Sequence, residues 1–192
     1  MRIFFLLALL SSVLVSSATA QVIDTSKDTI ATRVQLLGAD CALFPAVARL
    51  PAWLPENKLP PSRRFTPTTS QAAAAEQVMA TVQLLQVNST PKTRRDSTYA
   101  RNITQQLGQY YRQYFGFYNR RKQPCLLINF LGDVAFSAED IGLRLKPPGY
   151  IPQWLRAYLF IGGGGANHWS IYYNLTTGKF YQYWHSLDLS GG

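Results

Sequence analysis

The stretch His168–His185, HWSIYYNLTTGKFYQYWH, decides the fold class of this chain. Aromatic and β-branched residues dominate both halves, and such residues favour the pleated, half-buried surface of a β-sheet. Between the halves, Asn174 can bond back to the turn backbone, and Gly178 can adopt the positive φ that closes a four-residue loop. The stretch therefore predicts an antiparallel hairpin with strands over residues 168–174 and 179–185.

The turn also predicts the register of this hairpin, because successive side chains alternate between the two faces of a strand. If Asn174 faces Lys179, each face carries three facing pairs. One face has Tyr173 with Phe180, Ile171 with Gln182 and Trp169 with Trp184; the other has Tyr172 with Tyr181, Ser170 with Tyr183 and His168 with His185. Both faces of the hairpin are therefore expected to be rich in aromatic side chains.

Working upstream, the same composition predicts a second antiparallel hairpin. Its strands are expected over Tyr110–Tyr118 and Cys125–Leu131, on either side of a polar, basic turn. Leu155–Ile161 predicts a third strand segment, and Gly162–Asn167 a glycine-rich connection into the last hairpin. The C-terminal half is thus expected to be mostly sheet.

Helical spacing appears between these strands and the N-terminus. A long helix is predicted from Ser70 to Val87, with one buried face and a cap at Thr68, Thr69 or Ser70. A shorter helix is expected over Ser97–Leu107. The fold class predicted is α+β: one long helix packed on an antiparallel sheet of about four to five strands, with a Pro-rich N-terminal arm.

That arm follows from the prolines, since six of the eleven fall within residues 41–67. Each proline removes a backbone donor and restricts the residue before it, so regular structure is unexpected there. Residues 21–37 show only weak helical spacing. The domain organisation predicted is a signal peptide over 1–20, an N-terminal segment with the Pro-rich arm over 21–67, and an α+β domain over 68–192.

The first twenty residues have the features of a cleavable secretory signal. Arg2 supplies the positive charge, residues 3–15 form an apolar run, and Ala18-Thr19-Ala20 provides the small residues at a cleavage site. The run is shorter than the roughly 20 residues that span a bilayer. We expect a secreted or periplasmic protein with no transmembrane span after signal cleavage.

Two cysteines, Cys41 and Cys125, are the only ones in the chain. In an oxidising compartment this even count predicts one disulfide. The closed loop would span about 85 residues, for which chain entropy gives about 4–5 kcal/mol of stabilisation. Three Asn-x-Ser/Thr sequons, at Asn88, Asn102 and Asn174, would be glycosylation sites in a eukaryotic secretory route.

The chain is basic, with a formal net charge of +9 and a pI of about 9.8. The cations fall in short clusters within predicted turns, at Arg63-Arg64, at Lys92/Arg94/Arg95 and at Arg120-Arg121-Lys122. Solvated turns are one interpretation. The alternative is electrostatic binding to an anionic polymer or to an envelope surface.

Three motifs within residues 107–184 resemble a group of small exported bacterial proteins of uncharacterised activity. The motifs are Tyr111-Arg112-Gln113-Tyr114-Phe115-Gly116, Leu127-Ile128-Asn129-Phe130, and Gly163-Gly164-Gly165 leading into Tyr172–Phe180. They belong to strands and turns, so the resemblance implies a shared architecture and no known activity. The Asn-Gly-containing end typical of that group is replaced here by Leu187–Gly192.

The main enzymatic hypothesis is a cysteine hydrolase. Cys125 would be the nucleophile, His168 the base, and Asp188 or Asn167 the group that orients the base. Against it, Cys125 begins a predicted strand, where no helix dipole lowers its pKa, and the predicted disulfide would consume it. A serine mechanism through Ser170 or Ser186 with a histidine is weaker still, because neither serine lies in a nucleophile elbow.

No cofactor and no metal site is predicted. His168, His185 and Asp188 lack the ligand spacing of a metal site, and the adjacent Glu139 and Asp140 would diverge on a helix instead of forming an opposed acid and base.

The leading hypothesis is a secreted, non-enzymatic binding domain that recognises another macromolecule or a glycan through an aromatic sheet face. The helix would cover one face of the sheet and leave the other available. Tyrosine and histidine tolerate a wet surface better than tryptophan, isoleucine and phenylalanine. The predicted binding residues are Tyr172, Tyr181, Tyr183, His168 and His185.

Overall fold

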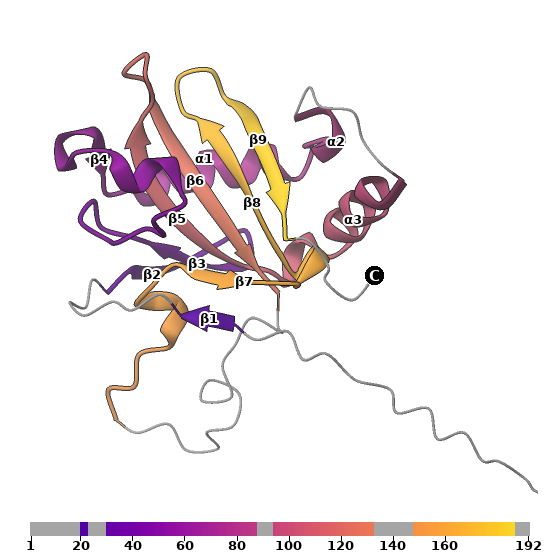
Figure 1. The fold of residues 1–192 in the computed structure, drawn as a ribbon, viewed down its shortest axis with the longest axis horizontal. Coiled ribbons are helices and arrows are strands. Elements are labelled where there is room, and N and C mark those ends of the chain that lie inside the picture. Colours follow the sequence, from indigo (N-terminus) through magenta and orange to yellow (C-terminus); the bar gives the residue numbers. More distant parts are fainter. Residues whose placement is uncertain (1–19, 23–29, 88–93, 133–147, 187–192) are drawn as a thin grey trace, which may run out of the picture.

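The computed structural model describes residues 20–22, 30–87, 94–132 and 148–186 (Figure 1). Its centre is a seven-stranded sheet, in which six strands follow the order β2-β3-β5-β6-β8-β9 and β4 pairs with β5. These strands are β2 (Thr32–Leu36), β3 (Ala39–Leu43), β4 (Arg64–Phe65), β5 (Tyr111–Tyr118), β6 (Pro124–Leu131), β8 (His168–Asn174) and β9 (Lys179–His185). A separate two-stranded sheet pairs β1 (Ala20–Val22) with β7 (Leu159–Ile161).

The fold-class prediction of one long helix on an antiparallel sheet of four to five strands is wrong. The sheet has seven strands and is mixed, because β3 runs parallel to β5 while its other ladders are antiparallel. The described residues form three α-helices, all short: α1 (Thr69–Met79), α2 (Leu84–Val87) and α3 (Arg94–Gln105). A parallel pair needs a long crossover, and these helices lie in the segment between β3 and β5.

The long helix predicted over Ser70–Val87 is divided into α1 and α2. Thr68 caps α1 through a capping box, in which its hydroxyl accepts from the backbone N–H of Gln71 and the Gln71 side chain accepts from the Thr68 N–H. After Met79 the chain turns, and the Thr81 hydroxyl donates to the carbonyl of Val78. That bond gives the Val78 carbonyl a side-chain partner at the point where the helix ends.

The prediction of a Pro-rich arm is also wrong, because the N-terminal segment supplies three strands of the sheet. β2 lies where weak helical spacing had been read and forms a hairpin with β3, and β4 pairs with β5. β4 comes so close that a Cβ at Gly116 would lie 2.5 Å from the backbone oxygen of Phe65. Glycine is therefore required at this point of β5.

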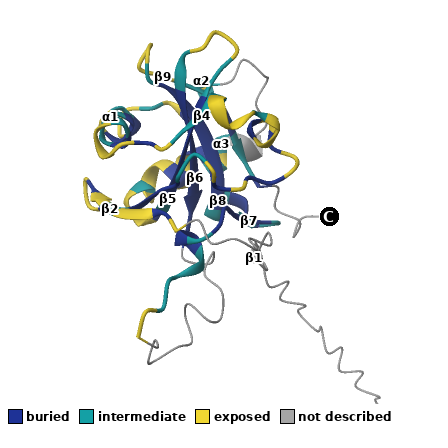
Figure 2. Ribbon diagram, turned by 90° about the vertical axis from the view of Figure 1, so that its left-hand side faces the viewer, coloured by how far each residue is buried: buried dark blue, intermediate teal, exposed yellow. Residues whose placement is uncertain are grey.

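Two hydrophobic clusters occupy the two faces of the sheet. The first packs α1, α2 and α3 against one face, around Met79, Ile103 and Trp169. The second covers the other face with residues 44–54, a 3-10 turn at Gln153–Leu155, and β7. In Figure 2 the central strands β5, β6 and β8 are mostly dark blue between these layers, whereas exposed residues lie in β2 and in the outer helices and turns. Both faces of the sheet are therefore covered, so neither is free as a whole to bind a partner.

The predicted disulfide between Cys41 and Cys125 is absent, and both thiols are free and buried. Cys41 pairs with Arg112 and lies in the helix-side cluster, whereas Cys125 pairs with Phe117 and lies in the opposite cluster. They are separated by one strand and by five positions along β5, about 17 Å at 3.3 Å per residue. A disulfide needs Cα atoms within about 7 Å, so the two cannot pair in this fold.

A buried ion pair joins α1 to the middle of the sheet. Arg112 on β5 donates from Nε to Oε1 of Glu76 at 3.1 Å, and the hydroxyl of Tyr114 donates to the same oxygen. Arg112 also donates to the carbonyls of Tyr110 and, at 2.8 Å, Leu107. Arg112 is almost fully buried, with 2 % of its surface exposed. The ion pair and these hydrogen bonds offset the cost of removing its charge from water.

Candidate functional site

The last hairpin contains a β-bulge that changes which face its side chains occupy. The predicted pairing holds near the turn, where Asn174 faces Lys179 and Tyr172 faces Tyr181. Beyond it, two residues of β9 oppose one residue of β8, and Gln182 adopts φ 51°. Ser170 then faces Trp184, not Tyr183, so the predicted register is wrong in the second half of the hairpin.

The bulge divides the five predicted binding residues between the two faces. Tyr172, Tyr181 and His168 lie on the face away from the helices, where Tyr172 and His168 are buried. Tyr183 is buried in the helix-side cluster, and the His185 ring makes a tilted contact with Tyr99 of α3, with centroids 4.6 Å apart. Of the five, Tyr181 lines a surface groove.

His168 is fully buried in a polar network that joins β7 to the sheet. Asn129 donates from Nδ2 to Oε1 of Gln113 at 2.9 Å and to the carbonyl of Leu159 at 2.8 Å. Its Oδ1 therefore faces Nε2 of His168, 3.0 Å away, and that nitrogen must donate.

The other ring nitrogen, Nδ1, accepts from the backbone N–H of Ile161 at 3.4 Å and lies 2.6 Å from Oγ of Ser186. Ser186 Oγ is also 2.7 Å from the carbonyl of Ile161. Because Nδ1 accepts a hydrogen bond, it carries no proton, and the imidazole is neutral with its hydrogen on Nε2. Burial lowers the pKa of His168 to about 4. The rings of Phe160 and Trp184 make edge contacts with the His168 ring, at centroid distances of 5.1 and 5.3 Å. The network therefore holds the layers of the fold together.

The structure does not bring the residues of the hydrolase hypothesis together. Along the β6–β8 ladder, Cys125 pairs with Asn174 and His168 pairs with Leu131, so the two lie six positions apart, about 20 Å. Burial raises the pKa of the Cys125 thiol, which disfavours the nucleophilic thiolate. Asp188 lies outside the described residues. Ser186 does contact His168, but it is buried and follows a strand end.

One groove lies at the edge of the sheet face opposite the helices. It has a volume of about 570 Å³, within the range of small-ligand sites. Three segments form it: the 3-10 turn at Pro55–Lys58 with its flanks, the end of β5, and the bulged part of β9. The lining residues are Trp53, Pro55, Glu56, Lys58, Leu59, Arg63, Phe117, Tyr118, Asn119, Arg120, Tyr181 and Gln182.

Trp53 is the main exposed aromatic residue of this groove, with 51 % of its surface accessible. Its ring is fixed by edge contacts to Phe160 at 5.3 Å, Trp184 at 5.7 Å and Tyr158 at 6.1 Å. Trp184 reaches this position because the bulge turns it to this face. A rigid aromatic ring is thus presented to solvent at low entropic cost.

Glu56 forms the polar floor of the groove. It is buried, and its Oε2 accepts a hydrogen bond from the Tyr172 hydroxyl at 2.9 Å. Burial raises the pKa of Glu56, although the bond from Tyr172 and the charge of Arg64 act in the opposite direction. Tyr172, predicted to bind a ligand directly, instead supports this carboxyl group from beneath.

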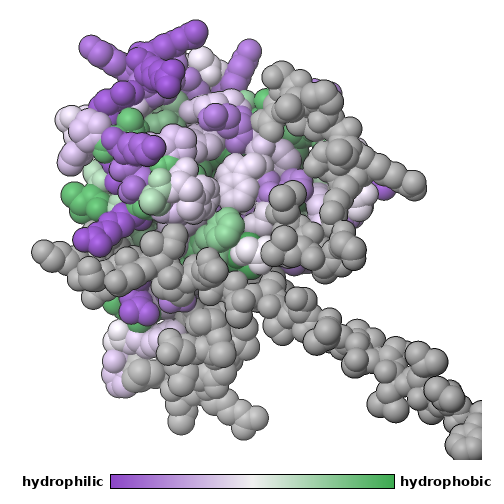
Figure 3. All heavy atoms as spheres, in the orientation of Figure 1, coloured by the Kyte–Doolittle hydropathy of each residue, from purple (hydrophilic) through white to green (hydrophobic). Residues whose placement is uncertain are grey.

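Cations surround the groove at the end of the sheet where the β5–β6 and β8–β9 turns meet. Lys58 and Arg120 line it and are exposed; Arg121 and Lys122 are exposed in the β5–β6 turn, and Lys179 is exposed at the start of β9. Figure 3 shows hydrophilic side chains gathered at the upper end of this face, above paler residues in its middle. The site therefore combines aromatic surface, one buried carboxyl group and a basic rim.

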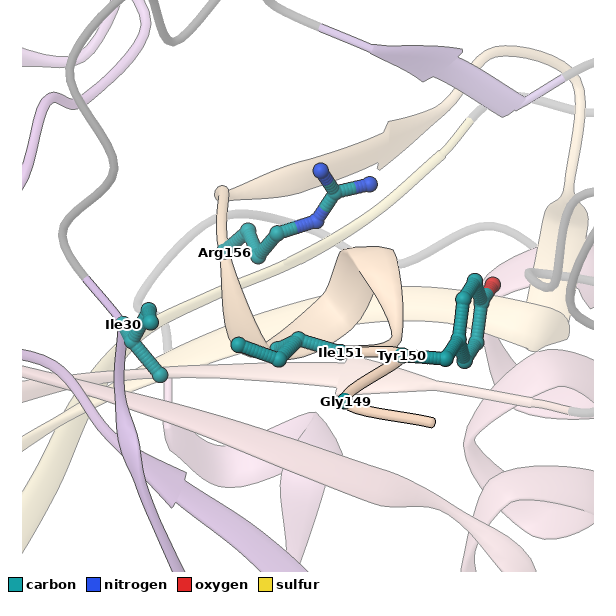
Figure 4. A pocket seen from close by; sticks show the side chains of 5 residues that line it. All are labelled: Ile30, Gly149, Tyr150, Ile151 and Arg156. Atoms are coloured by element: carbon teal, nitrogen blue, oxygen red, sulfur yellow. The ribbon is translucent and has the colours of Figure 1, made fainter. Parts of the chain in front are cut away.

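Two other hollows are less suited to ligand binding. Figure 4 shows one of about 260 Å³, with Ile30 on one side, Tyr150 on the other and the Arg156 side chain above Ile151. The second, of about 470 Å³, lies between α2 and α3 and is mostly apolar. Neither combines an exposed aromatic ring with several cations. Within the described residues there is no cluster of three or more potential metal ligands, and no helix is long and apolar enough to cross a membrane.

Comparison of the chain with protein-family models, with curated proteins and with solved structures gives no match in any of the three. The resemblance of residues 107–184 to exported bacterial proteins stays a prediction.

Sequence reasoning missed Trp53, Glu56 and Lys58, because the Pro-rich stretch around them was interpreted as an arm. One signal was present: Pro51-Ala52-Trp53-Leu54-Pro55 places a large aromatic residue between two prolines, which fix the backbone on either side.

Proposed function

We propose that this chain is an exported, non-enzymatic binding domain that holds a glycan in the groove above Glu56. The observation that carries the proposal is Trp53, half exposed yet fixed by three aromatic neighbours at the mouth of the groove. An aromatic face of this kind binds the apolar face of a sugar ring.

The polar groups of the groove suit sugar hydroxyls. The Glu56 carboxyl group and the exposed side chains of Lys58 and Gln182 supply acceptors and donors along the floor and walls. Ligand sites typically pair a mostly apolar lining with a few such groups. The groove has the mixed character that a sugar, with one apolar face and a polar edge, requires.

Binding is favoured over cleavage by the number of carboxyl groups. Glycoside hydrolysis commonly uses a pair of carboxyl groups on either side of the scissile bond. Among the described lining residues Glu56 is the sole carboxyl group, and Tyr172 occupies one of its oxygens. The signal peptide predicted for residues 1–20 would deliver the domain to the compartment where envelope and extracellular glycans occur.

The test is calorimetric titration with three defined probes: cellohexaose, chitohexaose and hexagalacturonate. At least one should bind, and Trp53→Ala should weaken that binding about tenfold or more, since loss of an anchoring aromatic costs on the order of 2 kcal/mol. Val47→Ala is the matched control, because Val47 is an exposed apolar residue that does not line the groove. No binding of any probe, or equal losses in both variants, would refute the proposal.

A further inference from the structure

We infer that the glycan bound in this groove is anionic, an inference that rests on the proposed function and specifies its substrate class. The observation behind it is that three segments of the chain, far apart in sequence, bring their cations together in the fold. Arg63, Arg120 and Lys179 belong to these segments and would not be grouped from the sequence alone.

Hydrogen bonds hold the three segments together. Arg63 donates from Nη2 to the carbonyls of Tyr118 and Asn119, at 2.7 and 2.5 Å, which fixes the segment before β4 to the β5–β6 turn. The Asn174 amide donates to Oε1 of Gln123 at 2.9 Å, which fixes the β8–β9 turn to the same place. The cations of all three segments therefore lie at one end of the sheet, beside the groove.

The carboxylate ion pairs that the structure describes lie elsewhere in the fold. Asp40 pairs with Arg33 at 2.8 Å, and Glu76 pairs with Arg112 at 3.1 Å. Within the described part of the chain, no ion pair engages the exposed cations Lys58, Arg120, Arg121, Lys122 and Lys179. Such a patch attracts an extended anion and releases its counterions.

The groove favours an anionic glycan over a nucleic acid, which the same cations would also attract. Glu56 lies on the floor of the groove with its carboxyl group held by Tyr172. A carboxyl group there accepts hydrogen bonds from the many hydroxyls of a sugar ring. It would repel the phosphates of a nucleic acid whose backbone lay in the groove. The arrangement suits a glycan that places its hydroxyls in the groove and its carboxylate or sulfate groups against the cations of the rim.

The experiment compares hexagalacturonate with neutral cellohexaose and with a twenty-nucleotide oligothymidylate, by calorimetry at low and high salt. Hexagalacturonate should bind more tightly than cellohexaose by about tenfold or more near 50 mM salt, and this advantage should shrink as salt rises. The double variant Arg120→Gln/Arg121→Gln should lose the advantage. Arg33→Gln/Arg101→Gln removes the same charge away from the groove and should keep it.

The outcomes separate this inference from the proposed function. Equal binding of both hexasaccharides, weakened by Trp53→Ala, would overturn the anionic ligand and leave glycan binding intact. Tighter binding of oligothymidylate than of hexagalacturonate, dependent on Trp53, would overturn the inference in favour of a nucleic acid. Absence of any Trp53-dependent saccharide binding would overturn both.

Discussion

The ring of Trp184 on β9 lies 5.7 Å from the ring of Trp53, on the sheet face opposite the helices. Strand alternation alone would place Trp184 on the same face as Phe180, which packs against the helix-side cluster. The bulge at Gln182 reverses this by inserting one residue into β9. The support beneath Trp53 therefore depends on a backbone irregularity, and bulges often re-aim a side chain beside a functional site.

Gln182→Gly should stabilise the protein slightly. Gln182 adopts φ 51°, a conformation that costs a non-glycine residue roughly 1–2 kcal/mol. Glycine removes this cost, but its greater loss of backbone entropy in a strand destabilises the folded protein by about 0.5–1 kcal/mol. Urea unfolding should show a net gain of up to about 1 kcal/mol. Gln182→Ala keeps the strain and should change stability little. A clear loss of stability in the glycine variant alone would contradict the bulge.

Both cysteines should be free thiols. Under non-reducing denaturing conditions, a thiol assay should count two per chain, because Cys41 and Cys125 lie on opposite faces of the sheet. In the native protein both should react slowly with iodoacetamide, since burial raises the pKa of Cys41 to about 12 and also raises that of Cys125. A disulfide found by peptide mapping would refute the strand arrangement.

Stability should fall as pH falls through the range from about 6.5 to about 4. His168 stays neutral in the folded protein down to a pKa of about 4, whereas in the unfolded chain it takes up a proton near 6.5. The unfolded state therefore binds more protons across this window and gains up to about 3 kcal/mol. Above pH 6.5 the imidazole is neutral in both states and contributes no slope.

The measurement is the free energy of unfolding from urea titrations between pH 4 and 7, compared between wild type and His168→Gln. Glu56, whose pKa is raised, has the opposite effect: its contribution to stability is lost as pH rises. The difference between the two proteins isolates His168. His185→Gln controls for loss of an imidazole as such. Parallel curves for wild type and His168→Gln would contradict the neutral buried histidine.

The buried pair Arg112–Glu76 should matter far more than the surface pair Arg33–Asp40. Glu76→Ala leaves a buried guanidinium without its counter-charge, which costs about 3–5 kcal/mol. Asp40→Ala removes the partner of an exposed arginine and should cost less than about 1 kcal/mol. Thermal or urea unfolding compares the two. Similar small losses in both would show that α1 does not dock on β5 as described.

The two hairpins could be predicted from sequence because their determinants are local. The strands at 168–174 and 179–185 were placed correctly, and Gly178 does take a positive φ of 64°. The predicted sequon at Asn174 is less accessible than its motif suggests, since its Oδ1 accepts from the N–H groups of Thr176 and Thr177 within the turn. Turn chemistry explains both features.

What could not be predicted depends on contacts between distant segments. The parallel pairing of β3 with β5 leaves no periodic signal in either strand. The bulge carries no glycine, so nothing local marks Gln182. Trp53 and Glu56 belong to a segment whose prolines hide any periodicity, and only the fold brings them to Tyr181. The candidate site was therefore anticipated at one residue, Tyr181, and in its aromatic and basic character.

The most direct test of glycan binding at Trp53 uses the indole N–H resonances of the four tryptophans, recorded while hexagalacturonate is added to ¹⁵N-labelled protein. Trp53 lies at the groove and Trp184 packs against it, whereas Trp154 and Trp169 are buried in the two core clusters. Binding at Trp53 should give a saturable shift that is largest for Trp53, smaller for Trp184 and negligible for the two buried indoles. Unchanged Trp53 with shifts elsewhere, or no shift at saturating hexagalacturonate, would contradict it.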